Sequence, residues 1–219
     1  MAGFAVIDLE TSGLSRSAGA RIIEIAIVQL DEQLHVESTW TTLVATLGDV
    51  GPTRLHHITP EMLQGAPTFH EITGDVLQRM DGRVLVAHNI MFDEKFLRSA
   101  LQEVVGIELE PFPGLCTARL AQDIYQTSRL QRLESLAVSF GIPVHNLHAA
   151  LPDTVLCAEV LLRLLNAASA VTREAALATS PVHVGHIDIP PTGRVHLRPV
   201  AGLSLQLDVQ RAEPGALHV

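Results

Sequence analysis

The first part of the chain shows apolar residues in short runs with a period of two, and many of them are β-branched. This pattern is typical of strands buried on one or both faces. It predicts strands at residues 4–10, 21–30 and 35–44. Residues 31–33 form a link short enough for a hairpin, so we expect the sheet to begin as an antiparallel meander.

From about residue 60 the apolar positions fall three and four residues apart, which is typical of helices with one buried face. We expect helices at residues 60–64, 70–80, 92–105, 117–125, 132–140 and 152–167, and a fourth strand at 83–87. Antiparallel strands followed by alternating strand and helix predict an α/β fold, a mixed sheet flanked by helices. We expect residues 1–170 to form one domain.

Beyond residue 180 the helical period disappears and prolines and glycines become frequent. Apolar residues alternate with a period of two at 182–184, 187–189, 195–197 and 203–209. Residues 171–219 are therefore expected to form a linker and a small C-terminal β-rich appendage that turns at residues 190–193. No motif in this part indicates its role.

Composition narrows the class of protein. With 219 residues, 47% of them hydrophobic, the chain is long enough to bury a full core, and no apolar run is long enough to span a membrane. A net charge of −9 argues against a broad basic face that grips duplex nucleic acid. Two cysteines and no signal-peptide pattern predict a cytoplasmic protein in a reducing compartment with no membrane partner.

The first candidate site lies where the first strand ends. Asp8 and Glu10 are two residues apart in the strand, so their carboxylates project from the same side. Two acids held together repel each other unless a cation or a shared proton neutralises them, and a hard divalent metal suits oxygen ligands. The other interpretation is a strand that ends in solvated acids before a turn, and the pair alone does not decide between them.

Further acids occur at two other strand or loop ends. Asp93 follows His88 and Asn89 in the expected first turn of a helix, and Asp153 follows His148 in a loop that leads into another helix. Taken singly, each acid could serve only to complement a helix dipole. Four carboxylates and a histidine at strand ends and helix starts, however, repeat one arrangement, and this favours a shared site.

Three segments resemble the exonuclease motifs of the DnaQ-like, DEDDh-type 3'-5' exonucleases: residues 7–14, 87–93 and 148–153. The resemblance implies a ribonuclease H-like fold and phosphodiester hydrolysis that depends on two Mg²⁺ or Mn²⁺ ions. It assigns Asp8, Glu10, Asp93 and Asp153 as the metal ligands and His148 as the general base. Oxygen ligands suit such cations, and a loop histidine can take a proton near neutral pH.

The resemblance also implies substrate contacts. It places Thr11 and Leu14 against the terminal nucleotide, Phe92 beneath the site and His56 near the nucleotide, and we take Asn89 as a further contact. The family usually has glycine where this chain has His57, so the local backbone is open to question.

The first hypothesis is a 3'-5' exonuclease that acts on single-stranded or frayed DNA ends and releases nucleoside monophosphates in proofreading or repair. An exoribonuclease that trims RNA ends is the second hypothesis, since no residue here reveals contacts to a 2'-hydroxyl. A catalytically idle binding module docked on a polymerase is the third. The expected partners are a nucleic acid 3' end and a DNA polymerase or repair protein.

Overall fold

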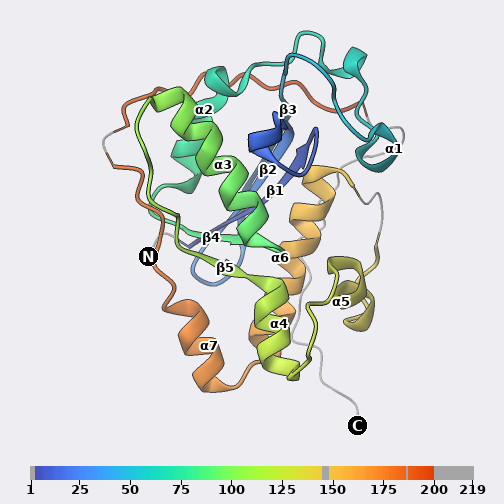
Figure 1. Ribbon diagram of the computed structural model, residues 1–219. Helices are drawn as coiled ribbons and strands as arrows, with labels where there is room; N and C mark the ends of the chain where they lie inside the picture. The colour runs from blue at the N-terminus through green and yellow to red at the C-terminus, as the bar shows by residue number, and fades with distance from the viewer. Residues whose placement is uncertain (1–2, 145–147, 186, 200–219) are drawn as a thin grey trace.

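The computed structural model of the protein describes residues 3–144, 148–185 and 187–199. Its centre is a five-stranded sheet in the order β3-β2-β1-β4-β5 (Figure 1). The strands are β1 (Phe4–Thr11), β2 (Ile22–Leu30), β3 (Val36–Leu43), β4 (Val84–Ala87) and β5 (Gly114–Cys116). The sheet is mixed, as the sequence predicts.

The pairing confirms the expected meander and extends it. β1 pairs antiparallel with β2, and β2 pairs antiparallel with β3, whereas β4 pairs parallel with β1 and β5 parallel with β4. The sequence did not predict β5, because a strand of three residues is too short for a period to register. β1 therefore lies in the middle of the sheet. β4 pairs only with Phe4–Val6, so the carboxyl end of β1, which carries Asp8 and Glu10, is paired with β2 alone.

Helices cover both faces of the sheet (Figure 1). They are α1 (Thr53–His56), α2 (Phe69–Met80), α3 (Ile90–Val105), α4 (Thr117–Tyr125), α5 (Leu133–Ser139), α6 (Ala150–Ala167) and α7 (Ala170–Leu177), with 3₁₀ turns at Arg16–Ala18 and Pro60–Leu63. The predicted helices are confirmed with shifted ends, and α1 and α7 are additional. None of the helices in the described residues is both long and apolar enough to cross a membrane.

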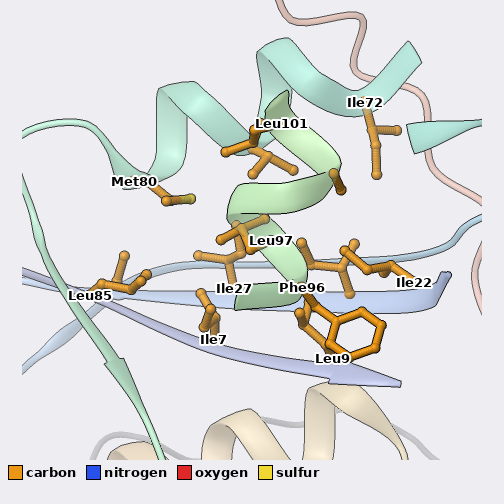
Figure 2. Close-up of a cluster of buried hydrophobic side chains, with 14 of the residues drawn as sticks. Ile7, Leu9, Ile22, Ile27, Ile72, Met80, Leu85, Phe96, Leu97 and Leu101 are labelled. Carbon is orange, nitrogen blue, oxygen red and sulfur yellow. The ribbon is translucent and has the colours of Figure 1, made fainter. Parts of the chain in front are cut away.

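One core lies between the sheet and the helices α2 and α3. Ile7 and Leu9 of β1 meet Phe96, Leu97 and Leu101 of α3 there, with Met80 and Ile72 of α2 alongside (Figure 2). These strand residues are odd-numbered, as expected for one face of a strand. Burial of apolar surface at roughly 25 cal/mol per Å² is the main force that holds this layer.

The even-numbered residues of β1 face the other way. Phe4 and Val6 pack in a second core with α4, α5 and α6, where Leu161 and Leu164 of α6 are fully buried. Asp8 and Glu10 continue this even-numbered row toward the end of the strand. The alternation of the strand thus directs both acids to the face that α6 covers.

The end of the chain departs from the prediction. Residues 170–177 are helical, and the described residues 178–185 and 187–199, called here the C-terminal arm, contain no strand. Val182 is fully buried, and Val184, Ile187 and Ile189 pack on the core beside α2 and α3. Their alternation reflects an extended chain with one face on the core rather than pairing within a β appendage. Residues 203–209 lie outside the described part, and the division into domains stays a prediction.

Candidate active site

Asp8, Glu10 and Asp153 come together at the carboxyl end of β1. One ligand oxygen from each lies within 4.8 Å of the others. The two strand acids reach this point because they project from the same side of β1, and Asp153 reaches it from the first turn of α6. Tertiary structure therefore joins the first and third of the predicted motifs into one acidic cluster.

Asp153 has one oxygen engaged and one free among the described residues. Its Oδ2 accepts a hydrogen bond of 3.0 Å from the backbone N–H of His148. Its Oδ1 is buried and has no hydrogen-bond partner in the described structure. A buried carboxylate oxygen without a donor is costly unless a cation binds it, so this atom fits a metal ligand.

Asp93 lies in the first turn of α3 and is buried, as the second motif predicts. Burial raises the pKa of Asp93 to about 7, although hydrogen bonds from the backbone of Asp93 and Leu9 oppose the rise. Asp93 is close enough to Asp8 that its charge contributes to the raised pKa of Asp8. Asp93 thus belongs to the same electrostatic cluster.

Crowding and burial disfavour the charged forms throughout the cluster. Burial raises the pKa of Asp8 well above its usual value, with further increases from Asp93 and Glu10. Burial likewise raises the pKa of Glu10 to about 8 and that of Asp153 to about 6. The raised pKa values mean that burial and mutual repulsion oppose the negative charge of all four carboxylates. Bound cations would offset this repulsion, and carboxylate oxygens suit hard divalent ions.

Glu24 is a buried carboxylate beside the cluster that the motifs did not predict. It stands directly opposite Glu10 across the β1–β2 pair, and its Oε2 accepts a hydrogen bond of 3.1 Å from the backbone N–H of Ala150 at the start of α6. Arg198 of the C-terminal arm pairs with it at 2.9 Å. The sequence does show Glu24 as a lone glutamate within an apolar strand. A glutamate is rarely buried without a partner, so this position could have indicated a paired or functional residue.

His148 precedes α6 and is half-buried. Its backbone φ of 64° lies in the left-handed region, which is strained for a residue other than glycine. Its charged form would lower the pKa of Asp153, although burial of that carboxylate dominates. The predicted general base therefore lies next to the cluster.

The predicted substrate contacts are distributed around the end of β1. The Leu14 side chain is 88% exposed, and Asn89 is exposed at the start of α3. Thr11 donates a hydrogen bond of 2.7 Å from its hydroxyl to the carbonyl oxygen of Gly13. Phe92 is half-buried and packs on Phe96 with ring centroids 4.8 Å apart. Leu14 and Asn89 are thus open to a ligand, whereas Phe92 is partly a core residue.

The ring of His56 is engaged inside the protein. It is 1% exposed, its Nε2–H donates to the carbonyl oxygen of Val50 at 3.0 Å, and its Nδ1 accepts from the N–H of Ile58 at 3.0 Å. This arrangement leaves neither ring nitrogen free for a nucleotide. The neighbouring His57 has a φ of 59°, so it adopts the left-handed conformation that glycine adopts most readily.

Comparison with known sequences agrees with the three motifs. A family model described as an exonuclease, RNase_T, matches residues 5–161. DNA polymerase III subunit epsilon of Treponema pallidum is 35% identical over 161 residues, which is 72% of this chain and 74% of that protein. The 3'-5' exonuclease DinG of Staphylococcus haemolyticus is 33% identical over 162 residues, which is 73% of this chain and 18% of DinG. The chain thus matches about a fifth of the length of such DinG proteins.

Solved structures share the fold at low sequence identity. The nuclease domain of 3'hExo, described as a DEDDh family member bound to rAMP, has a TM-score of 0.64 and 20% identity, and the match covers 74% of this chain and 91% of that domain. A structure of exonuclease I has a TM-score of 0.64 and 16% identity over 78% of this chain and 42% of that one. With the family model matched across the sheet and α6, the chain belongs to the RNase_T exonuclease family, as the DnaQ-like, DEDDh-type motifs predict.

Proposed function

We propose that this protein is a 3'-5' exonuclease that uses two divalent cations to hydrolyse the terminal phosphodiester of single-stranded or frayed DNA. The observation that carries the proposal is the half-buried cluster of Asp8, Glu10 and Asp153, with the buried Asp93 beside it. The unpartnered Oδ1 of Asp153 supports metal binding over a purely structural role for the acids. Mg²⁺ or Mn²⁺ suits these oxygen ligands.

Asp8, Glu10, Asp93 and Asp153 would hold the ions. When bound, two such ions supply positive charge beside the scissile phosphate, where negative charge develops. The protein groups are already arranged for this task, since the sheet and two helix starts fix them. Pre-arranged ligands need little reorganisation when the substrate binds.

His148 would take a proton from the attacking water. The water oxygen forms a bond to phosphorus, its proton passes to the imidazole, and the bond from phosphorus to the 3' oxygen of the preceding nucleotide breaks. That oxygen then takes up a proton, and the products are a nucleoside monophosphate and a shortened strand with a 3'-hydroxyl. Histidine suits this role because its unperturbed pKa is about 6.5.

The 3'-to-5' direction of cleavage and the choice of DNA as the substrate are inferred from the similar proteins. The named 3'-5' exonuclease DinG and the polymerase III epsilon subunit each match nearly three quarters of the chain. The exposed Leu14 supports contact with a terminal base, because apolar stacking and wedging tolerate any base. The net charge of −9 favours a short strand end as the substrate over a long duplex.

A protein partner belongs to the same proposal. The matching epsilon proteins are named as subunits of DNA polymerase III, which supports a role in proofreading or repair beside a DNA polymerase or repair protein. Binding of the purified protein to such a polymerase would test this part separately. The cytoplasmic location stays a prediction.

The experiment is a cleavage assay on strands labelled at the 5' end, so that shortening from the 3' end gives a ladder. Single-stranded DNA, duplex DNA with a mismatched 3' end, and RNA are each incubated with Mg²⁺, Mn²⁺ or chelator. We expect metal-dependent shortening of DNA that is lost in Asp8→Ala and strongly reduced in His148→Ala. Asp123→Ala, the same change at an exposed acid on α4, is the control and should cleave normally.

Three outcomes would count against the proposal. Preference for RNA would replace the substrate and keep the chemistry. Undiminished cleavage by Asp8→Ala would point to a contaminating nuclease. Absence of cleavage for every substrate would favour a binding module with no catalytic activity.

A further inference from the structure

The C-terminal arm crosses the molecule and ends beside the acidic cluster. It leaves α7, runs along α2 and continues past the top of the sheet toward α1 (Figure 1). It is attached early, where the backbone of Val182 exchanges hydrogen bonds of 2.8 Å with Gly82 and Arg83. Near its end, the carbonyl oxygen of His196 accepts a hydrogen bond of 2.8 Å from the N–H of Leu43 on β3.

Helix α2 carries features that fit this arm. The carboxylate of Asp75 accepts hydrogen bonds from the N–H groups of Thr192 and Gly193, at 2.8 and 3.2 Å. At Gly74 an added Cβ would lie 2.3 Å from the carbonyl oxygen of Pro190, so the arm backbone occupies the space that a side chain would need. The path of the arm is therefore specified by α2.

The arm ends with the guanidinium of Arg198 inserted among the active-site loops. Its Nε and Nη2 bond both oxygens of Glu24, at 3.2 and 2.9 Å. Nη1 donates to the carbonyl oxygen of His148 at 3.2 Å, and Nη2 also donates to the carbonyl oxygen of His56 at 2.7 Å. The side chain is 11% exposed, so these bonds are shielded from water.

These contacts fix the backbone on both sides of the His148 side chain. The N–H of His148 donates to Asp153, and its carbonyl oxygen accepts from Arg198. Two residues further along, the N–H of Ala150 donates to Glu24, which Arg198 holds in turn. A left-handed residue such as His148 persists only where its surroundings hold it.

Arg198 also balances charge at the edge of the cluster. Burial raises the pKa of Glu24, and the positive charge of Arg198 lowers it again. Glu10, directly opposite Glu24, feels the same cation. A guanidinium can bind a carboxylate and two carbonyl oxygens at once because its N–H groups form a planar fork, which an ammonium lacks.

We propose that Arg198 is a positioning residue of the active site, which holds the His148 loop and Glu24 in the geometry that hydrolysis requires. The C-terminal arm is by this inference a functional part of the nuclease. The inference rests on the proposed function, in that His148 takes the proton from water. In the described residues, the hydrogen bonds of Arg198 go to Glu24 and to the carbonyl oxygens of His148 and His56, so it would act through these groups.

The test compares Arg198→Ala and Arg198→Lys with Arg194→Ala in the full chain. Arg194 is the matched control, since it lies on the same arm but is half exposed and pairs with Glu71 on α2. We expect Arg198→Ala to lower kcat about 10- to 100-fold while KM changes little, because misplaced catalytic groups slow the chemical step. Free guanidinium should restore part of this kcat, and Arg194→Ala should match the wild type.

Arg198→Lys keeps the positive charge. It therefore tests the positioning role in a folded protein even if Arg198→Ala lowers the melting temperature. We expect a wild-type melting temperature with a kcat reduced at least about fivefold, because the ammonium cannot replace the planar fork. Wild-type kcat in Arg198→Lys would overturn the inference, since charge alone would then suffice. A raised KM with unchanged kcat in Arg198→Ala would also overturn it, and would indicate direct contact with the strand.

A readout without activity separates this inference from the proposed function. The NMR signal of the His148 imidazole, assigned by its loss in His148→Ala, should shift or broaden in Arg198→Ala and stay in place in Arg194→Ala. An unchanged signal would refute the positioning role whatever the activity. If the wild type cleaves nothing, or His148→Ala cleaves normally, the proposed function fails while this spectrum still tests the contact.

Discussion

Replacing Asp93 by asparagine should make the metal-free protein more stable, and increasingly so as the pH rises. Asp93 is buried in the cluster, and its pKa is raised from 3.8 to about 7, first by burial. The folded state therefore binds the proton more tightly than the unfolded chain does. Between about pH 4 and pH 7, unfolding releases that proton, so stability falls as the pH rises through this window.

The size of the effect follows from the two pKa values. Each pKa unit corresponds to about 1.36 kcal/mol, so a rise from 3.8 to about 7 removes about 4 kcal/mol of stability by pH 8. Asparagine carries no charge at any of these pH values and escapes this loss. It also removes a charge that raises the pKa of Asp8, which adds to the gain.

The assay is urea unfolding of wild type and Asp93→Asn in the presence of chelator, from about pH 5 to pH 8. The stability difference in favour of the variant should grow across the series and level off above the folded pKa. Asp123→Asn, at an exposed position, controls for the loss of a charge in general. A difference between Asp93→Asn and wild type that does not change with pH would refute the reasoning.

Three further predictions concern the metal ions, the arm and the core. Mg²⁺ at a hundred times its Kd should stabilise the wild type by about 2.7 kcal/mol in thermal unfolding, and Asp153→Ala should lose this response; equal responses would contradict the ligand assignment. Gly74→Ala should lower the free energy of unfolding by about 1–3 kcal/mol and also lower kcat, because the added Cβ displaces Pro190 of the arm. Alanine favours helices, so a gain in stability would mean that the arm is not seated on α2. Leu101→Ala should lower the free energy of unfolding, measured in urea, by about 2–5 kcal/mol and leave kcat unchanged at low temperature. A much smaller loss of stability would mean that the core collapses around the cavity left by the leucine side chain.

Much of the central fold could be predicted from the sequence because its elements carry local periods. The strands β1 to β4 and the longer helices appear in the pattern of apolar residues, and the structure confirms them. The candidate ligands were predictable for a related reason, since the spacing of Asp8 and Glu10 places both on one side of β1. Their grouping with Asp153 follows once strand and helix are docked.

The predictions were wrong where the same alternation of apolar residues can arise from more than one structure. The apolar residues of the arm alternate as in a strand, yet the arm is an extended chain that packs one side on the core and forms no strand itself. The resemblance predicts His56 as a nucleotide contact, but nothing in the sequence indicates that both of its ring nitrogens are bonded within the protein. Sequence patterns report burial, and hydrogen-bond partners depend on where distant segments meet.

The sequence by itself determined the strand and helix periods, the side from which Asp8 and Glu10 project, and the identity of the acids and the histidine. Tertiary structure alone decided that Glu24 stands opposite Glu10 and that Arg198, 174 residues further along the chain, binds it beside His148. The physical reason is that backbone geometry fixes the direction of a side chain locally. Strand register and the docking of an arm depend instead on packing and hydrogen bonds summed over the whole molecule, which no local pattern records.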